Sequence, residues 1–276
     1  MHGGWNRGWL AALAALLLAS LAPALAAEPA LRLTAGGTTR SFSAADLLAR
    51  PDAASITLPR DASYGRPMTY RAVPLRALLA GLAPGDADTV EARATDGFVS
   101  QLPLALVEGP AEAWIAVEDP AHPWPKLPGK PVSAGPFYLV WRAPARGPVA
   151  AEQWPYALAE LTAVDSPAHR WPAIAVAASL APDDPARRGQ ALFATNCLPC
   201  HRLAGAGEGT VGPDLLRPMP ATAYFTEAGL RALLRDPASV RTWPAQQMPR
   251  FDRAALSDQD IGAVIAYLRH LAARTR

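Results

Sequence analysis

The pentapeptide Cys197-Leu198-Pro199-Cys200-His201 decides which fold and chemistry are predicted for the second half of this 276-residue chain. Its spacing is C-x-x-C-H, and it holds both cysteines of the sequence. Two thiols at this spacing can each add to one vinyl group of a haem, and the adjacent histidine then lies beneath the iron as its proximal ligand. The pattern therefore predicts one covalently attached haem c.

Three other interpretations of this motif stay open. A thioredoxin-like redox pair expects a βαβ setting, whereas a short helix is predicted directly before Cys197. A zinc site needs four ligands, and the chain has no further cysteine to supply them. The third alternative is a motif that arose by chance and binds nothing.

The sequence around the motif is helical in pattern. Asp183-Asp184-Pro185 is a cap followed by a proline, which predicts a helix through Thr195. Ser257-Asp258-Gln259-Asp260 has the pattern of a capping box, and the apolar residues after it share one helical face: Ile261, Val264, Ile265 and Leu268. Residues 185–276 are therefore predicted to form one small all-α domain.

From Pro185 to Ala273 the chain resembles a class I c-type cytochrome. Such domains cross their first and last helices through a glycine and aromatic residues, and Gly189, Phe193 and Tyr267 stand at the matching places. The segment 212–215, Gly-Pro-Asp-Leu, resembles the family loop whose proline carbonyl accepts the ring N–H of the proximal histidine. The resemblance implies that this bond strengthens the imidazole as an iron ligand.

The resemblance also implies a methionine as the distal ligand. Met248, in the segment 247–251 (Gln-Met-Pro-Arg-Phe), matches the M-P-x-F pattern of the family, and Met219 is the competing thioether. A closed His/Met site cannot bind substrate at iron, so it moves one electron at a time at a raised potential. The glycine-rich segment 205–209 is not a phosphate-binding loop, and we expect it to let the backbone approach the haem edge.

The first half of the chain alternates short β-rich runs with turns. We expect strands at 31–34, 89–94, 98–102, 114–117 and 137–141, and helices at 43–48 (capped by Ser43) and 74–80 (stopped by Gly81). Residues 28–165 are thus predicted to form a mixed α/β, sheet-rich domain. The proline- and alanine-rich segment 166–184 is the expected linker.

Three stretches of this half resemble the sulfite-oxidase-like molybdopterin-binding fold: 69–79, 94–104 and 137–141. The resemblance implies helices around a sheet. Enzymes of that type ligate molybdenum with a cysteine thiolate, and residues 28–165 contain no cysteine. This argues against a molybdopterin cofactor, although pterin binding without protein ligation stays open. No binding residue of that family can be carried over.

The remaining candidates of the first half are weaker. His122 and His169 lack partners at ligand spacing, so each is expected to be a solvated or satisfied imidazole. Glu118-Asp119 beside His122 could bind a cation or form a polar turn. The tryptophans are expected in the core or at a domain interface rather than on a stacking platform: Trp114, Trp124 and Trp141.

The N-terminus has the pattern of an export signal. An apolar run spans residues 9–21, and Ala24-Leu25-Ala26 offers small residues at the spacing that a signal peptidase reads. The run is short for a membrane span, so residues 1–26 are predicted to be a signal peptide. The mature protein is then periplasmic, with a membrane contact only if the signal stays uncleaved.

The charge pattern bears on partners. The net charge is +2 without any charged block, which argues against a nucleic-acid partner. From Pro185 onward, the chain has twelve arginines and seven acidic residues. Arg202 and Arg250 could border the haem crevice and attract an acidic redox partner. The preferred interpretation is an electron-transfer protein with a redox donor and acceptor, whose first domain serves for docking or ligand binding. The alternative is a haem-containing oxidoreductase whose first domain binds a pterin or substrate.

Overall fold

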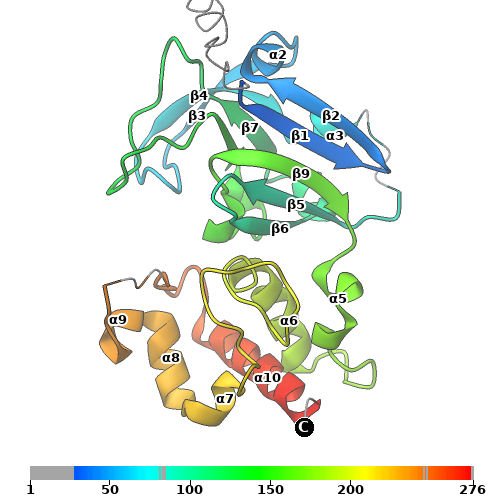
Figure 1. Cartoon of the computed structure of the whole chain (residues 1–276), viewed down its shortest axis with the longest axis vertical. Coiled ribbons are helices and arrows are strands. Elements are labelled where there is room, and N and C mark those ends of the chain that lie inside the picture. The colour runs from blue at the N-terminus through cyan, green and yellow to red at the C-terminus, as the bar shows by residue number, and fades with distance from the viewer. Residues whose placement is uncertain (1–27, 81, 83–84, 245, 247, 275–276) are drawn as a thin grey trace, which may run out of the picture.

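The chain folds into a sheet-rich first domain and a helical second domain (Figure 1). This is a computed structural model, and it describes residues 28–80, 82, 85–244, 246 and 248–274. The predicted signal peptide and Gly81 lie outside the described residues. The expected division between a sheet-rich and an all-α part is confirmed.

The strands of the first domain divide between two sheets, where the resemblance implied helices around a sheet. Five strands pair in the order β2-β1-β9-β5-β6, and four in the order β3-β4-β7-β8. Their bounds are β1 (Ala30–Ala35), β2 (Thr38–Ser43), β3 (Ala54–Leu58), β4 (Met68–Pro74), β5 (Thr89–Ala94), β6 (Val99–Pro103), β7 (Ala113–Val117), β8 (Phe137–Trp141) and β9 (Leu158–Val164). The short helical segments between them are α2 (Ala44–Leu48), α3 (Leu75–Leu79), α4 (Leu104–Val107), η1 (Pro144–Arg146) and η2 (Ala151–Gln153).

Local sequence accounts for the first turns of this domain. Gly36 and Gly37 both adopt positive φ, 54° and 76°, as a tight hairpin between β1 and β2 requires. Ser43 caps α2 in a capping box with Asp46. The strand β9, which the sequence analysis missed, pairs with both β1 and β5, and so joins the beginning and the end of the domain in one sheet.

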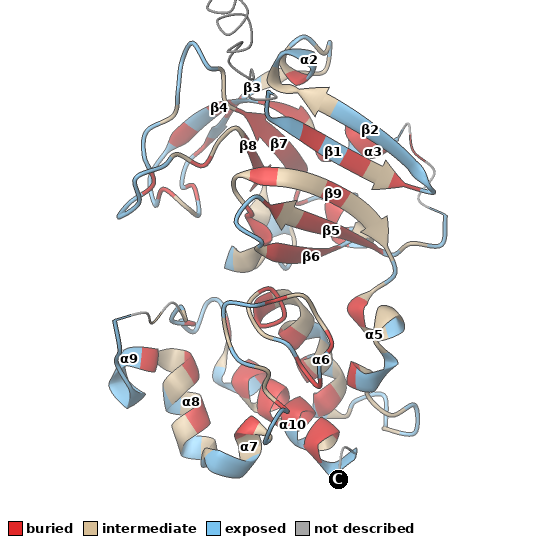
Figure 2. Cartoon of the chain, viewed as in Figure 1, coloured by how far each residue is buried: buried red, intermediate tan, exposed pale blue. Residues whose placement is uncertain are grey.

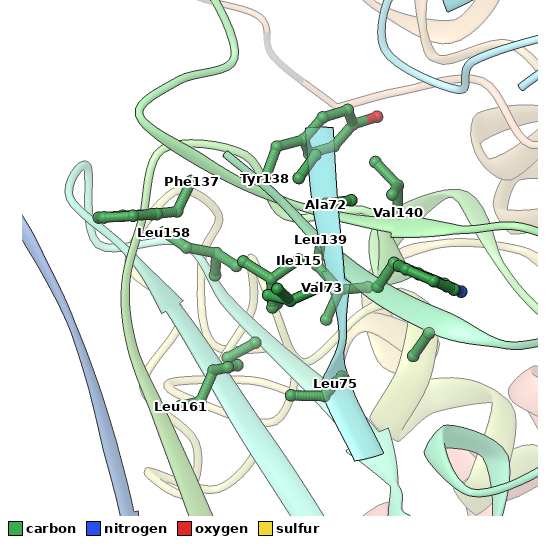
Figure 3. Packing of buried hydrophobic residues seen from close by; sticks show 14 of the residues in the cluster. Ala72, Val73, Leu75, Ile115, Phe137, Tyr138, Leu139, Val140, Leu158 and Leu161 are labelled. Carbon is green, nitrogen blue, oxygen red and sulfur yellow. The ribbon is translucent and has the colours of Figure 1, made fainter. Parts of the chain in front are cut away.

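The core of the first domain lies between the two sheets. Every residue of β7 and β8 is buried (Figure 2), and side chains of β4, β8 and β9 pack together in one cluster (Figure 3). A strand that is buried on both faces has a continuous apolar sequence. This is why a strand at 137–141 could be predicted from the sequence. Trp114 and Trp141 are core residues, and Trp124 packs edge-on against Tyr70 at 4.8 Å, as expected.

The second domain consists of α6 (Pro185–Asn196), α7 (Ala221–Tyr224), α8 (Glu227–Arg235), α9 (Pro237–Val240) and α10 (Asp258–Arg274). Asp184 caps α6, and Ser257 forms the predicted capping box with Asp260. Within the described residues, no helix is long and apolar enough to cross a membrane.

The segment 166–184 is ordered against the second domain. It contains α5 (Pro167–Arg170) and η3 (Pro172–Ile174). Ile174 is buried, and its carbonyl accepts a hydrogen bond of 2.6 Å from the Tyr267 hydroxyl of α10. The amide of Val176 donates to Gln190 of α6 at 2.6 Å. These contacts fix the connection on α6 and α10.

Candidate haem site

The C-x-x-C-H motif begins where α6 ends. Cys197 is the C-cap of α6, and its amide donates to the Phe193 carbonyl at 2.9 Å. The amide of His201 then donates to the Cys197 carbonyl at 2.8 Å, which closes a tight turn. Both thiols are free, and burial raises their pKa values. The motif therefore presents two unpaired thiols and one imidazole from a single turn.

The imidazole of His201 is oriented by the loop that the sequence analysis singled out. Its Nδ1 donates to the Pro213 carbonyl at 2.8 Å, which confirms the predicted hydrogen bond. Burial lowers the pKa of His201, against the opposing effect of that bond, so the ring is held neutral at neutral pH. A neutral ring with a protonated Nδ1 leaves the Nε2 lone pair available to a metal.

Glycines allow the chain to close on the motif. A Cβ atom at Gly212 would lie 2.3 Å from Cε1 of His201, and one at Gly209 would lie 2.5 Å from the carbonyl carbon of Cys200. Gly207 packs on Leu198 in the same way. The glycine-rich segment thus lies against the haem-attachment motif itself. Whether it also borders the haem edge stays a prediction.

Asp214 organises this loop, and the sequence analysis did not assign it a role. Its Oδ1 accepts from the amides of Ala204, Leu216 and Arg217 at 2.8–3.1 Å, and its Oδ2 accepts from Gly205 at 2.6 Å. Four amide donors on one carboxylate fix the residue next to Pro213. The available signal was an aspartate directly after Gly-Pro, a residue type that commonly accepts backbone amides in turns.

The two candidate distal ligands differ in environment. Met248 is half-buried and packs against a cluster that contains Phe251, Leu256 and Ile265. Met219 is 50% exposed. A thioether held among apolar side chains suits a closed site better than one in solvent, so the packing favours Met248.

The two long helices cross as the resemblance implied. A Cβ atom at Gly189 of α6 would lie 2.0 Å from the Ala263 carbonyl oxygen of α10, so only glycine permits this crossing. The rings of Phe193 and Tyr267 pack beside it, 5.6 Å apart between centroids. This crossing fixes the end of α6, and with it the first cysteine.

The charged residues expected at the rim are on the surface. Arg202 is exposed, and Arg250 is exposed with its Nε 3.1 Å from Asp236. Among its described residues, the first domain brings together no set of three metal ligands that could compete with this site. His122 Nδ1 lies 2.9 Å from the Asp119 carboxylate, and Glu118 accepts from the Trp124 amide. His169 is exposed, with its Nδ1 3.9 Å from Asp88. No group of three metal-ligating side chains occurs among the described residues.

Comparison with known proteins now places the second domain. Residues 186–272 match the family model described as Cytochrome c. This part of the chain is a cytochrome c domain. Such a domain implies a haem c cofactor and electron transfer, and it is typical of extracytoplasmic proteins. The donor set of His201, Met248 and two free thiols fits that group.

The comparisons say little about the first domain. No curated protein matches the chain. One solved structure that it resembles is the sulfane dehydrogenase SoxCD from Paracoccus pantotrophus, with 17% identity and a TM-score of 0.36. The likeness covers 49% of this chain and 38% of that one, so this chain spans well under half of its length. A likeness at this TM-score does not establish the fold family of the first domain. The resemblance to sulfite-oxidase-like proteins stays a prediction.

Proposed function

We propose that this protein is an exported monohaem cytochrome that passes single electrons between two redox proteins in the periplasm. Cys197 and Cys200 attach the haem, His201 is the proximal ligand and Met248 the distal one. The hydrogen bond from His201 Nδ1 to the Pro213 carbonyl carries this proposal, because it aligns the ring and commits the other nitrogen to the iron.

The side chains of this site hold and tune the group rather than react. Haem, when bound, supplies an iron that changes between Fe(II) and Fe(III). A neutral imidazole and a thioether add no charge to the iron, and thioether ligation favours the reduced form. Met248 packs against an apolar cluster, and an iron held by both His201 and Met248 would bind no substrate.

The first domain acts in this proposal as a docking or ligand-binding module. It contains no cysteine that could ligate molybdenum, and its described residues hold no cluster of metal ligands. The exposed arginines Arg202 and Arg250 favour a partner that is acidic at its docking face.

Covalent haem staining and metal analysis test the proposal together. The full chain, made in a host that attaches haem and synthesises molybdopterin, should stain for haem after denaturing electrophoresis. It should contain about one iron atom per chain, as one C-x-x-C-H motif implies, and essentially no molybdenum. Cys197→Ser and Cys200→Ser should each reduce the stain. A fully stained double variant refutes the attachment, and stoichiometric molybdenum refutes the docking role.

A further inference from the structure

The loop of residues 205–213, here the proximal loop, carries the hydrogen-bond acceptor of His201. Its Gly212 amide donates to the Cys200 carbonyl at 2.8 Å, and its Pro213 carbonyl accepts from the imidazole. Gly209 approaches the backbone of Cys200 too closely for any side chain, and Gly207 has a φ of 90°, which favours glycine. The position of this loop therefore sets the position of the Pro213 carbonyl relative to the ring.

The first domain also contacts the same loop. Glu208 lies between Gly207 and Gly209, and its side chain forms an ion pair with Arg93 of β5. The same guanidinium nitrogen of Arg93 donates to Glu91 at 2.9 Å. One arginine thus joins a central strand of the first domain to the loop beside the haem motif.

The inner end of this connection is firmly anchored. The side chain of Glu91 is only 9% exposed, and it accepts from Arg170 at 2.7 Å and from Gln101 at 3.2 Å. Burial opposes its ionisation, yet these hydrogen bonds hold the pKa of the Glu91 carboxyl below its ordinary value. Because β5 pairs with β6 on one side and β9 on the other, Arg93 projects from a rigid base.

We propose that Arg93 is a positioning residue for the haem site: it clamps Glu208, and through the proximal loop it fixes the Pro213 carbonyl against His201. The inference rests on the proposed ligation by His201. The first domain then contributes to the iron site without touching the iron, because an outer hydrogen bond tunes the ligand that it orients. The coupling runs through contacts that can be removed singly.

Hydrogen exchange tests the clamp independently of haem chemistry. In the full chain, Arg93→Gln and Glu208→Gln should each accelerate amide exchange at Gly212 about threefold, as loss of a partly exposed ion pair allows. Arg93→Lys should restore most of the protection. Arg142→Gln is the matched control, because it removes an arginine–glutamate pair of the same domain, with Glu112 at 3.2 Å, at the end of the other sheet. Unchanged exchange in both clamp variants overturns the proposal.

Measurements on the holoprotein distinguish a positioning effect of Arg93 on His201 from the electrostatic effect of its charge on the haem potential. Arg93→Gln removes a positive charge and Glu208→Gln a negative one, so electrostatics alone shift the haem potential in opposite, additive directions. Loss of the clamp instead moves the paramagnetically shifted His201 ring resonances in the same direction in both variants, without additivity in the double variant. Additive, opposite potential shifts with unmoved ring resonances would refute the clamp. A wild-type protein without haem would refute the proposed function, and hydrogen exchange would still decide the clamp.

Discussion

The first domain packs around one continuous cluster of buried side chains, part of which Figure 3 shows. The buried side chains of the cytochrome c domain fall into two clusters. One of the two contains Cys197 and Leu198 of the motif with Phe193 and Tyr267. The other packs against Met248. In the cytochrome c domain, the attachment motif and the candidate distal ligand Met248 thus lie against separate apolar clusters.

This difference indicates which domain a prosthetic group would stabilise. Leu192 and Leu215 are the partly buried side chains that pack against both clusters of the cytochrome c domain. A flat apolar group bound between His201 and Met248 would join the clusters into one core. Stability of the cytochrome c domain is then expected to depend on haem more than stability of the first domain does.

The largest expected effect follows from removing the attachment. In the Cys197→Ser, Cys200→Ser double variant, residues 185–276 should be digested on the order of tenfold faster or more, because a group bound only by the folded state no longer stabilises it. Residues 28–165 should remain resistant. Limited proteolysis followed by mass spectrometry of the fragments measures both, with wild-type holoprotein digested in parallel. Equal resistance of the two domains would contradict the comparison.

A change at the helix crossing should affect the cytochrome c domain alone. Gly189→Ala places a methyl group against the Ala263 carbonyl and should destabilise that domain by about 2 kcal/mol, as overpacking does. Gly262→Ala on α10 is the control, because its Cβ would meet only the end of the Arg231 side chain at 3.2 Å, and alanine favours helix. Thermal unfolding followed in the haem absorption band distinguishes the two. Equal melting temperatures would refute the role of Gly189.

Substitution of Met248 and of Met219 tests which of the two is the distal iron ligand. Met248→Ala should abolish the sulfur-to-iron charge-transfer band of the ferric protein and lower the potential, because a thioether ligand favours Fe(II). Met219→Ala should change neither, since this side chain lies on the surface. Absorption spectra and redox titration of both variants provide the measurement. The reverse pattern would assign the ligand role to Met219.

The smallest effect concerns docking. Electron-transfer rates with the native partner should fall as ionic strength rises, because salt screens exposed charges over a Debye length of about 10 Å at 0.1 M. Arg250→Glu should flatten that dependence, whereas Arg32→Glu on the first domain should leave it unchanged. Stopped-flow kinetics across a salt series measures the slopes. Salt-independent rates in all three proteins would mean that docking is apolar.

Much of the structure could be predicted because its signals are local. A capping box at Ser43 or Ser257, a glycine pair at 36–37 and an apolar run at 137–141 each act within a few residues. Four strands were missed: β2, β3, β4 and β9. The seven residues of β9 alternate only weakly, and its partners lie more than 60 residues away in sequence. The division into two sheets follows from such long-range pairing.

The sequence by itself determined the haem motif, its histidine and the proline that orients it, because two thiols and an imidazole need only the right spacing. Only the tertiary structure decided that Met248 is packed while Met219 is exposed. It also decided that Arg93 meets Glu208, 115 residues further along the chain. Ion pairs between distant segments leave no periodicity in a sequence, since folding alone brings their charges together.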